Sequence, residues 1–241
     1  MSLVSLVTGA GSGIGAAVVA ALAGRGDRVV GVDLAAEAVR RAAPQADPVS
    51  GDVTDPADCA AAVELAVTRY GRLDAVVACA GVELGGPAEE LAPEVFRRVV
   101  EVNLTGVFLT VQAAGRQLIR QGDGGSIVLI GSVNSTVALA GQAAYAASKG
   151  GVLMLGRALA VDWARYGIRV NVLGPGVVDT PMSARSLADP ERRAALMSRI
   201  PAGRPAAPAE IAAVAAFLTS PAASYVSGGY LPVDGGWLAN G

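Results

Sequence analysis

Histidine is absent from the 241 residues of the chain. This absence excludes catalytic triads that depend on an imidazole, and it removes the commonest nitrogen ligand of zinc sites. Two cysteines are present, Cys59 and Cys79, and their spacing matches neither a metal motif nor a disulfide framework. We therefore expect no bound metal, and the chemistry of the chain must come from other side chains.

Charged residues and long apolar runs are also scarce. Charged side chains make up 17% of the chain and leave a formal net charge of −2, so a nucleic-acid partner is not expected. Each apolar run is broken by Gly, Pro or charge well before the ~20 residues that a membrane span needs. The first residues, 1–7, lack the basic start of a signal peptide. We expect a cytoplasmic protein that has no membrane partner.

Hydrophobic residues, in contrast, make up 52% of the chain and fall into a repeated strand–helix pattern. This pattern predicts an α/β fold: a single Rossmann domain over residues 1–241, with a doubly wound parallel sheet of about seven strands and helices on both faces. Ligands in such sheets bind at the carboxyl ends of the strands. The expected strands are 3–8, 28–33, 48–53, 73–81, 126–130, 168–173 and 230–234, and the longer expected helices are 57–70, 93–120, 142–166 and 208–219.

The first strand leads into a glycine-rich turn, Thr8-Gly-Ala-Gly-Ser-Gly-Ile-Gly15, which opens a helix. Glycines let the backbone turn tightly and approach a pyrophosphate, which sits at the amino end of the helix. An acid, Asp33, ends the next strand 18 residues after Gly15, as in dinucleotide-binding βαβ units. A purely structural glycine turn is the alternative. The predicted dinucleotide site includes Gly9, Gly11, Ser12, Gly13, Ile14 and Gly15.

Asp33 also bears on which dinucleotide binds. A carboxylate at this position accepts hydrogen bonds from the adenosine ribose hydroxyls and repels a 2′-phosphate. The next residue, Leu34, is not an arginine that would compensate that phosphate. We therefore expect NAD rather than NADP as the cofactor. The alternative role of Asp33 is to cap the helix that follows it.

A second candidate group lies between Ser132 and Lys149. Tyr145 and Lys149 stand four residues apart in a predicted helix, so they share one face. An ammonium near a phenol favours the phenolate, so we expect the pKa of Tyr145 to lie below its ordinary value of about 10. Ser132, at the carboxyl end of a strand, can hydrogen-bond the same reacting oxygen. A chance surface pair is the alternative, but the candidate residues converge on predicted strand ends, at Gly9, Asp33, Asp52, Gly81, Ser132 and Pro175.

Residues 183–207 interrupt the strand–helix rhythm. They mix Arg, Ser and Pro with four scattered apolar side chains, and they fit no single strand or helix register. A long segment of this kind in a compact domain is usually functional, so we expect a mobile substrate lid. The alternative is an ordinary surface helix around 190–199. Asn134, Gln142 and Gly176 are expected to line the substrate pocket with this segment.

Taken in order, these motifs resemble those of the short-chain dehydrogenase/reductase family over essentially the whole chain. The resemblance implies that Tyr145 is the general acid/base and that Ser132 holds the substrate oxygen. Lys149 would bind the nicotinamide ribose and lower the tyrosine pKa, and Asn103 would support a water chain to Lys149. The matching residues are Thr8-Gly-x-x-x-Gly-Ile-Gly15, Asp52-Val53, Ala80-Gly81, Asn103, Ser132, Tyr145-x-x-x-Lys149, Pro175-Gly176 and Thr180.

The same resemblance implies contacts to the two ends of the cofactor. Asp52 and Val53 would border the adenine, and Val178 and Thr180 would contact the nicotinamide end. The family usually has Asn-Asn-Ala-Gly where this chain has Ala-Cys-Ala-Gly, so Cys79 offers backbone contacts without the amide. The expected cofactor site is Gly9, Gly11, Ser12, Gly13, Ile14, Gly15, Asp33, Leu34, Asp52, Val53, Cys79, Ala80, Gly81, Tyr145, Lys149, Pro175, Gly176, Val178 and Thr180.

The combined prediction is an NAD(H)-dependent oxidoreductase that interconverts a secondary alcohol and a ketone. One alternative is a reductase of 3-oxoacyl thioesters on acyl carrier protein, which Asp33 disfavours because that activity typically uses the phosphorylated cofactor. Another is a dinucleotide-sensing protein without turnover, which the complete set of candidate catalytic residues disfavours. The resemblance, and apolar residues spread beyond one face of the helix at 142–166, predict a homo-oligomer, a tetramer in particular.

Overall fold

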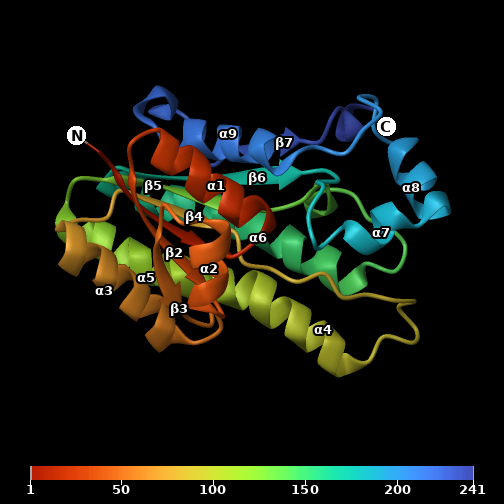
Figure 1. Cartoon of the computed structure of the whole chain (residues 1–241), viewed down its shortest axis with the longest axis horizontal. Helices are drawn as coiled ribbons and strands as arrows, with labels where there is room; N and C mark the ends of the chain where they lie inside the picture. Colours follow the sequence, from red (N-terminus) through yellow and green to blue (C-terminus); the bar gives the residue numbers. More distant parts are fainter. Residues whose placement is uncertain (1, 241) are drawn as a thin grey trace.

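The computed structural model describes residues 2–240, and its centre is one parallel sheet (Figure 1). The 7-stranded sheet has the order β3-β2-β1-β4-β5-β6-β7, and each neighbouring pair is parallel. The chain therefore winds outward in both directions from β1 and β4, as predicted for a doubly wound Rossmann-like domain. The strands are β1 (Val4–Thr8), β2 (Arg28–Asp33), β3 (Asp47–Ser50), β4 (Ala75–Ala78), β5 (Gly125–Ile130), β6 (Ile168–Pro175) and β7 (Tyr230–Val233).

Helices cover both faces of this sheet, and each face has its own apolar core. On one side Val7, Val77 and Val128 pack with three helices: α1 (Gly13–Gly24), α2 (Ala36–Ala42) and α9 (Pro208–Leu218). On the other side the alternate strand residues pack with α3 (Pro56–Tyr70), α5 (Gly106–Gln121) and α6 (Ala143–Trp163), and α4 (Pro93–Val100) packs on α6. Figure 1 shows α1 and α9 above the sheet and α3, α5 and α4 below it. Within residues 2–240, no helix has the length and apolar character needed to cross a membrane.

Two strands end three residues before their predicted carboxyl ends. The expected strand at 48–53 ends at Ser50, because the Asp52 carboxylate turns the chain by accepting hydrogen bonds from the backbone N and the hydroxyl of Thr54, at 2.9 and 2.7 Å. The expected strand at 73–81 is regular over Ala75–Ala78. Beyond it, the backbone N–H groups of Cys79 and Ala80 donate to the Thr8 hydroxyl instead of to a neighbouring strand.

The long helix predicted at 93–120 is interrupted. Between α4 and α5 the chain forms a five-residue π-helical turn, Glu101–Thr105. Asn103 lies in this turn and is fully buried, with its amide bonded to the backbone of Val82 in both directions. Single π-turns inside helices often mark functional sites, and here the turn gives a polar side chain a partner outside its own helix.

Part of the segment at 183–207 is helical, so the expectation that it fits no helix register was wrong, while the mobile lid stays a prediction. It contains α7 (Ala184–Ala188) and α8 (Pro190–Met197). Asp189 caps α8 by accepting from the backbone N–H groups of Glu191 and Arg192, both at 3.0 Å. An acidic N-cap followed by proline is a recognised helix start, and the scattered apolar residues concealed it.

Candidate functional site

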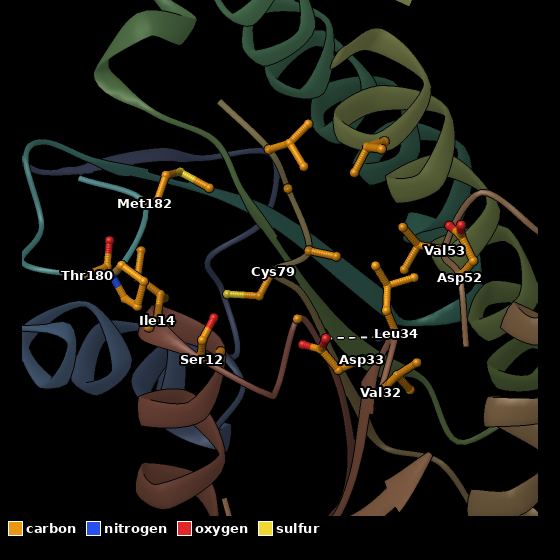
Figure 2. A pocket seen from close by; sticks show the side chains of 18 of the residues that line it. Ser12, Ile14, Val32, Asp33, Leu34, Asp52, Val53, Cys79, Thr180 and Met182 are labelled. Carbon is orange, nitrogen blue, oxygen red and sulfur yellow. Dashed lines mark hydrogen bonds between the residues drawn. The ribbon is translucent and has the colours of Figure 1, made fainter. Parts of the chain in front are cut away.

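An open cleft follows the carboxyl ends of β1, β2, β4, β5 and β6, at the point where the strand order reverses. It has two parts that share Ile14, Cys79, Gly81, Thr180 and Met182. We call the first the glycine-motif part, because Gly9 and residues 12–15 line it, and the second the tyrosine part, because Tyr145 lines it. Figure 2 shows the glycine-motif part, with Thr180 and Met182 at one end and Asp52 and Val53 at the other.

The glycine motif has the backbone that its sequence predicts. Gly9 and Gly13 have φ of 66° and 50°, values that side-chain-bearing residues rarely adopt. A Cβ atom on Gly15 would lie 2.0 Å from the carbonyl oxygen of Gly9, so a larger residue cannot fit. These three positions let α1 begin directly behind the end of β1. Ser12 precedes this helix in an extended conformation, which leaves the amino end of α1 open to the cleft.

Asp33 is held in place at the end of β2. Its Oδ2 accepts from the backbone N of Gly11 and its Oδ1 from the backbone N of Leu34, both at 2.9 Å, the second drawn in Figure 2. A Cβ atom on Gly11 would lie 2.9 Å from the Asp33 carboxyl, so glycine permits this approach. Ala35 is the N-cap of α2 and makes no side-chain capping bond. The carboxylate thus holds the glycine loop and does not cap α2.

Asp52 and Val53 line the far end of the glycine-motif part, together with Arg98 of α4. Hydrogen bonds from Thr54 lower the pKa of Asp52, and the nearby Arg98 guanidinium lowers it further. The sequence analysis missed Arg98. The neighbouring Val99 is fully buried, as an apolar residue of an amphipathic helix should be. No sequence pattern, however, indicates that Arg98 lies beside Asp52 and Val53.

The exit of β4, which includes Cys79, is held by a side chain of β1. The Thr8 hydroxyl accepts from the backbone N–H groups of Cys79 and Ala80, at 3.0 and 3.2 Å, so side-chain support comes from β1. Burial raises the pKa of the Cys79 thiol to about 12. The thiol therefore stays protonated near neutral pH and adds no negative charge at the junction of the two parts.

Asn103 stands behind the cleft wall. Its Nδ2 donates to the carbonyl of Val82 and its Oδ1 accepts from the N–H of Val82, both at 2.8 Å. A Cβ atom on Gly81 would lie 3.2 Å from Asn103 Oδ1 and 3.8 Å from Lys149 Nζ. The bare Gly81 backbone therefore lies between these two polar groups, and the Asn103 amide fixes the chain just beyond it.

Ser132, Tyr145 and Lys149 meet in the tyrosine part. Ser132 lies two residues beyond the carboxyl end of β5. Its Oγ accepts a hydrogen bond from the backbone N of Asn134 at 3.1 Å, so the hydroxyl hydrogen of Ser132 is free to donate. Lys149 is 4% exposed, and its Nζ donates to the Ile130 carbonyl at 2.8 Å and lies 5.6 Å from the centre of the Tyr145 ring. Tyr230 of β7 donates its hydroxyl to the Ser132 carbonyl at 2.8 Å. The serine is thus held through both its side chain and its backbone.

The direction of the Tyr145 pKa was predicted wrongly for the chain by itself. Burial raises the pKa of Tyr145 above its ordinary value, the carboxylate of Glu83 raises it further, and a hydrogen bond with Ser132 lowers it. Burial also lowers the pKa of Lys149 to about 8. For the chain by itself, the desolvation of the phenolate and the charge of Glu83 therefore set the direction of the Tyr145 pKa shift.

The pocket next to Tyr145 contains both expected and unexpected residues. Asn134 and Gln142 line it as predicted, with Gly176 and residues of the 183–207 segment. Glu83 and Trp237 also line it, and the sequence analysis missed both. A charged residue just after the predicted end of β4 was a usable signal for Glu83. The sequence carries no comparable signal that would bring Trp237, near the end of the chain, to this pocket.

Most of the predicted site residues line the cleft, and two lie behind it. Gly11 is bonded to Asp33, and Asn103 is buried against Val82. Over residues 2–240, no group of three or more His, Cys, Asp or Glu side chains is arranged to hold a metal ion. The lining residues of the glycine-motif part are Gly9, Ser12, Gly13, Ile14, Gly15, Asp33, Leu34, Asp52, Val53, Cys79, Ala80, Gly81 and Thr180, and those of the tyrosine part include Ser132, Tyr145, Lys149, Pro175, Gly176 and Val178.

Comparison with known proteins finds extensive similarity. A family profile described as enoyl-(acyl carrier protein) reductase matches residues 9–238. The chain is 43% identical over 241 residues to D-threitol dehydrogenase of Mycolicibacterium smegmatis, covering 97% of this chain and 92% of that protein. It is 45% identical over 243 residues to cis-4-hydroxycyclohexanecarboxylate dehydrogenase of Sinomonas cyclohexanicum, covering 98% and 96%. A solved structure from Beutenbergia cavernae, with NADP bound at low occupancy, has a TM-score of 0.91 at 40% identity and covers 98% of this chain and 97% of its own.

Proposed function

Because the chain belongs to the short-chain dehydrogenase/reductase family, we propose that it is an NAD(H)-dependent oxidoreductase that interconverts a secondary alcohol and a ketone. The observation that carries this proposal is one continuous cleft that joins the glycine motif and Asp33 to Tyr145, Lys149 and Ser132. The named activities of two relatives, both dehydrogenases of hydroxylated compounds, support the reaction class.

The glycine-motif part fits a dinucleotide. Glycine at positions 9, 13 and 15 keeps the backbone bare where a pyrophosphate would approach the amino end of α1. Asp33 and Leu34 would hold the adenosine ribose, and Asp52, Val53 and Arg98 surround the end of the cleft that suits the adenine. When bound, the nicotinamide supplies the acceptor or donor of the hydride.

The tyrosine part would hold and move the proton. In alcohol oxidation the Tyr145 oxygen takes the hydroxyl proton of the substrate while the C–H hydride leaves, and a carbonyl forms; reduction runs the same transfers backward. The Ser132 hydroxyl would donate to the reacting oxygen. Lys149, whose Nζ uses one donor on Ile130, has two further donors for the nicotinamide ribose. Positive charge brought beside Tyr145 would oppose the effect of burial and lower its pKa.

The choice of NAD over NADP rests on Asp33. Its carboxylate is fixed by Gly11 and Leu34, so it cannot swing away from a 2′-phosphate without breaking two hydrogen bonds. The residue beside it is Leu34, which offers the phosphate no counter-charge. Because the solved relative from Beutenbergia cavernae has NADP bound, assays of this chain with both cofactors test the preference directly.

Substitution of the proton carrier tests the proposed function. In Tyr145→Phe we expect kcat for NAD⁺-dependent alcohol oxidation to fall by about 10² or more, the scale of general acid–base catalysis. NADH affinity should change far less, because most of the cofactor contacts lie elsewhere in the cleft. Tyr225→Phe is the matched control, because Tyr225 is fully exposed. Turnover of the Tyr145 variant within a few-fold of the parent would show that another group carries the proton.

We also propose a homo-oligomer, a tetramer in particular. Two large apolar side chains of α6, Met154 and Val161, are 59% and 78% exposed, and Phe108 of the neighbouring α5 is 38% exposed. Contact with another copy would remove this apolar surface from water. Light scattering at micromolar concentration should give a multiple of the 24.0 kDa chain mass, and a monomer mass would contradict the proposal.

A further inference from the structure

One wall of the tyrosine part is a chain of three polar side chains. Asn134 Nδ2 donates to Gln142 Oε1 at 3.2 Å, and Gln142 Nε2 donates to Glu83 Oε1 at 2.5 Å. A carboxylate can only accept, so Glu83 fixes the direction of the Gln142 amide, and that amide in turn fixes Asn134. The acceptors left over on this wall are the other Glu83 oxygen and the Asn134 carbonyl oxygen.

One end of this wall is bonded to Ser132 at the reacting centre, and the other end lies where the loop after β4 meets the loop before α6. Asn134 is 5% exposed, and its backbone N donates to the Ser132 hydroxyl. The loop that carries Glu83 is joined to the start of α6 by a bond from the N–H of Gly86 to the carbonyl of Gly141, at 2.9 Å. A Cβ atom on Gly85 would lie 2.2 Å from that carbonyl, so the two loops approach as closely as glycine allows.

The charge around the wall is one-sided. Of the described residues that line the tyrosine part, Lys149 is the only one with a cationic side chain, and its ammonium is bonded to Ile130 beside the reacting centre. Glu83 is exposed to the pocket and carries the negative charge at the far end of the wall. An anionic group that extended from the reacting carbon toward Glu83 would meet repulsion and find no basic partner there.

Apolar side chains also line the tyrosine part: Leu139, Leu196 and Trp237, with Met182 at the junction. Carbon atoms of a substrate can pack on these side chains while its hydroxyl groups point to the acceptors. The hydroxyl groups of a substrate can donate to the two acceptors of this polar wall and accept from the second N–H of each amide, and the only charge on the wall is negative.

Resting on the proposed function, we propose that the substrates are neutral polyhydroxylated alcohols, polyols or reduced sugars, whose hydroxyl groups beyond the reacting carbon donate to Asn134 and Glu83. Hydroxy acids, which place a carboxylate near Glu83, are disfavoured. Simple secondary alcohols, which have no second hydroxyl, leave the wall unused.

The experiment compares three matched probe sets with NAD⁺ and NADP⁺. The first set is the tetritols, pentitols and hexitols, the second is the aldonates of the same chain lengths, and the third is 2-butanol and cyclohexanol. For the parent we expect kcat/KM for the best polyol to exceed that for every aldonate and every simple alcohol by at least about tenfold, or 1.4 kcal/mol.

Glu83→Gln removes the charge and keeps the shape. We expect kcat/KM for the best polyol to fall about tenfold, mostly through KM, and kcat/KM for the matching aldonate to rise. Glu89→Gln is the control, because Glu89 is an exposed glutamate of the same loop that does not belong to the wall. Its substrate ratios should equal those of the parent.

The outcomes separate the two proposals. Aldonates or simple alcohols turned over as well as the best polyol, or a polyol-to-aldonate ratio that Glu83→Gln leaves unchanged, would overturn the substrate class while dehydrogenase activity stands. Failure of all three sets to reduce either cofactor would overturn the proposed function itself.

Discussion

The cleft has two sides that are built differently, and we call them the floor and the cap. The floor, made from the exits of β1, β2 and β4, is tied by backbone hydrogen bonds to fixed side chains, as at Thr8, Asp33 and Asn103. The cap, made by α7 and α8, has no residue classed as buried in either helix. The cap is fastened at its ends: Val178 and Ala206 form a β-bridge, and Ile200 is 4% exposed.

This difference indicates which of the two sides, the floor or the cap, can move. Local opening costs little where few apolar contacts are buried and much where a polar network is fully bonded. The floor is therefore preorganised for a bound ligand, and we propose that the cap closes over the substrate. Leu196 of α8 reaches the pocket from this cap.

The largest expected effect comes from filling space in the floor. Gly15→Ala places a Cβ atom 2.0 Å from the Gly9 carbonyl, so the turn and α1 must separate. We expect a loss of unfolding free energy on the order of 3 kcal/mol, measured by urea denaturation, together with loss of NADH binding. Gly24→Ala at the other end of α1 meets no atom within 4 Å and should be neutral or slightly stabilising. Equal behaviour of the two variants would refute a tightly fitted floor.

Hydrogen exchange should show directly that the cap opens more easily than the floor. Amides of α7 and α8 should open with free energies lower than those of β5 and α6 by roughly 3 kcal/mol, because their side chains bury little. Addition of cofactor and substrate should slow exchange in α7 and α8 more than elsewhere. If these helices are as protected as the central strands before any ligand is added, the cap is not a lid.

Cofactor preference should change by a smaller amount. The parent should favour NAD over NADP by at least roughly tenfold in kcat/KM, or about 1.4 kcal/mol. Asp33→Ala removes the like-charge contact with the 2′-phosphate and should narrow that ratio. Leu34→Ala, which alters the same part of the cleft without changing charge, should keep the ratio. Equal use of both cofactors by the parent would remove Asp33 from this role.

The glycine turn and Asp33 in the floor could be predicted from the sequence because these residues answer local demands. Gly9 and Gly15 are required by φ and by close approach, and Asp33 follows from its place at a strand end. The N-cap of α8, Asp189 before a proline, could also have been predicted from the sequence, but the mixed composition of the segment favoured a loop.

Other features depend on contacts between distant segments. Arg98 and Trp237 reach the cleft through helix crossings and chain reversals that no local pattern specifies. The raised pKa of Tyr145 arises from burial and from Glu83, which the loop after β4 brings near. The four-residue spacing predicted that Lys149 would lie near Tyr145, but it did not predict that both side chains would be buried away from water.

The central claim is that Tyr145 carries the proton once positive charge in the cleft offsets its burial. Ultraviolet titration of the phenolate, taken as the difference between the parent and Tyr145→Phe, measures this pKa directly. We predict a value above the ordinary one of about 10 for the protein alone, in line with its burial, and a value below it at saturating NAD⁺. A pKa that NAD⁺ leaves unchanged, or a difference signal absent up to the pH at which the protein unfolds in both conditions, would contradict the claim.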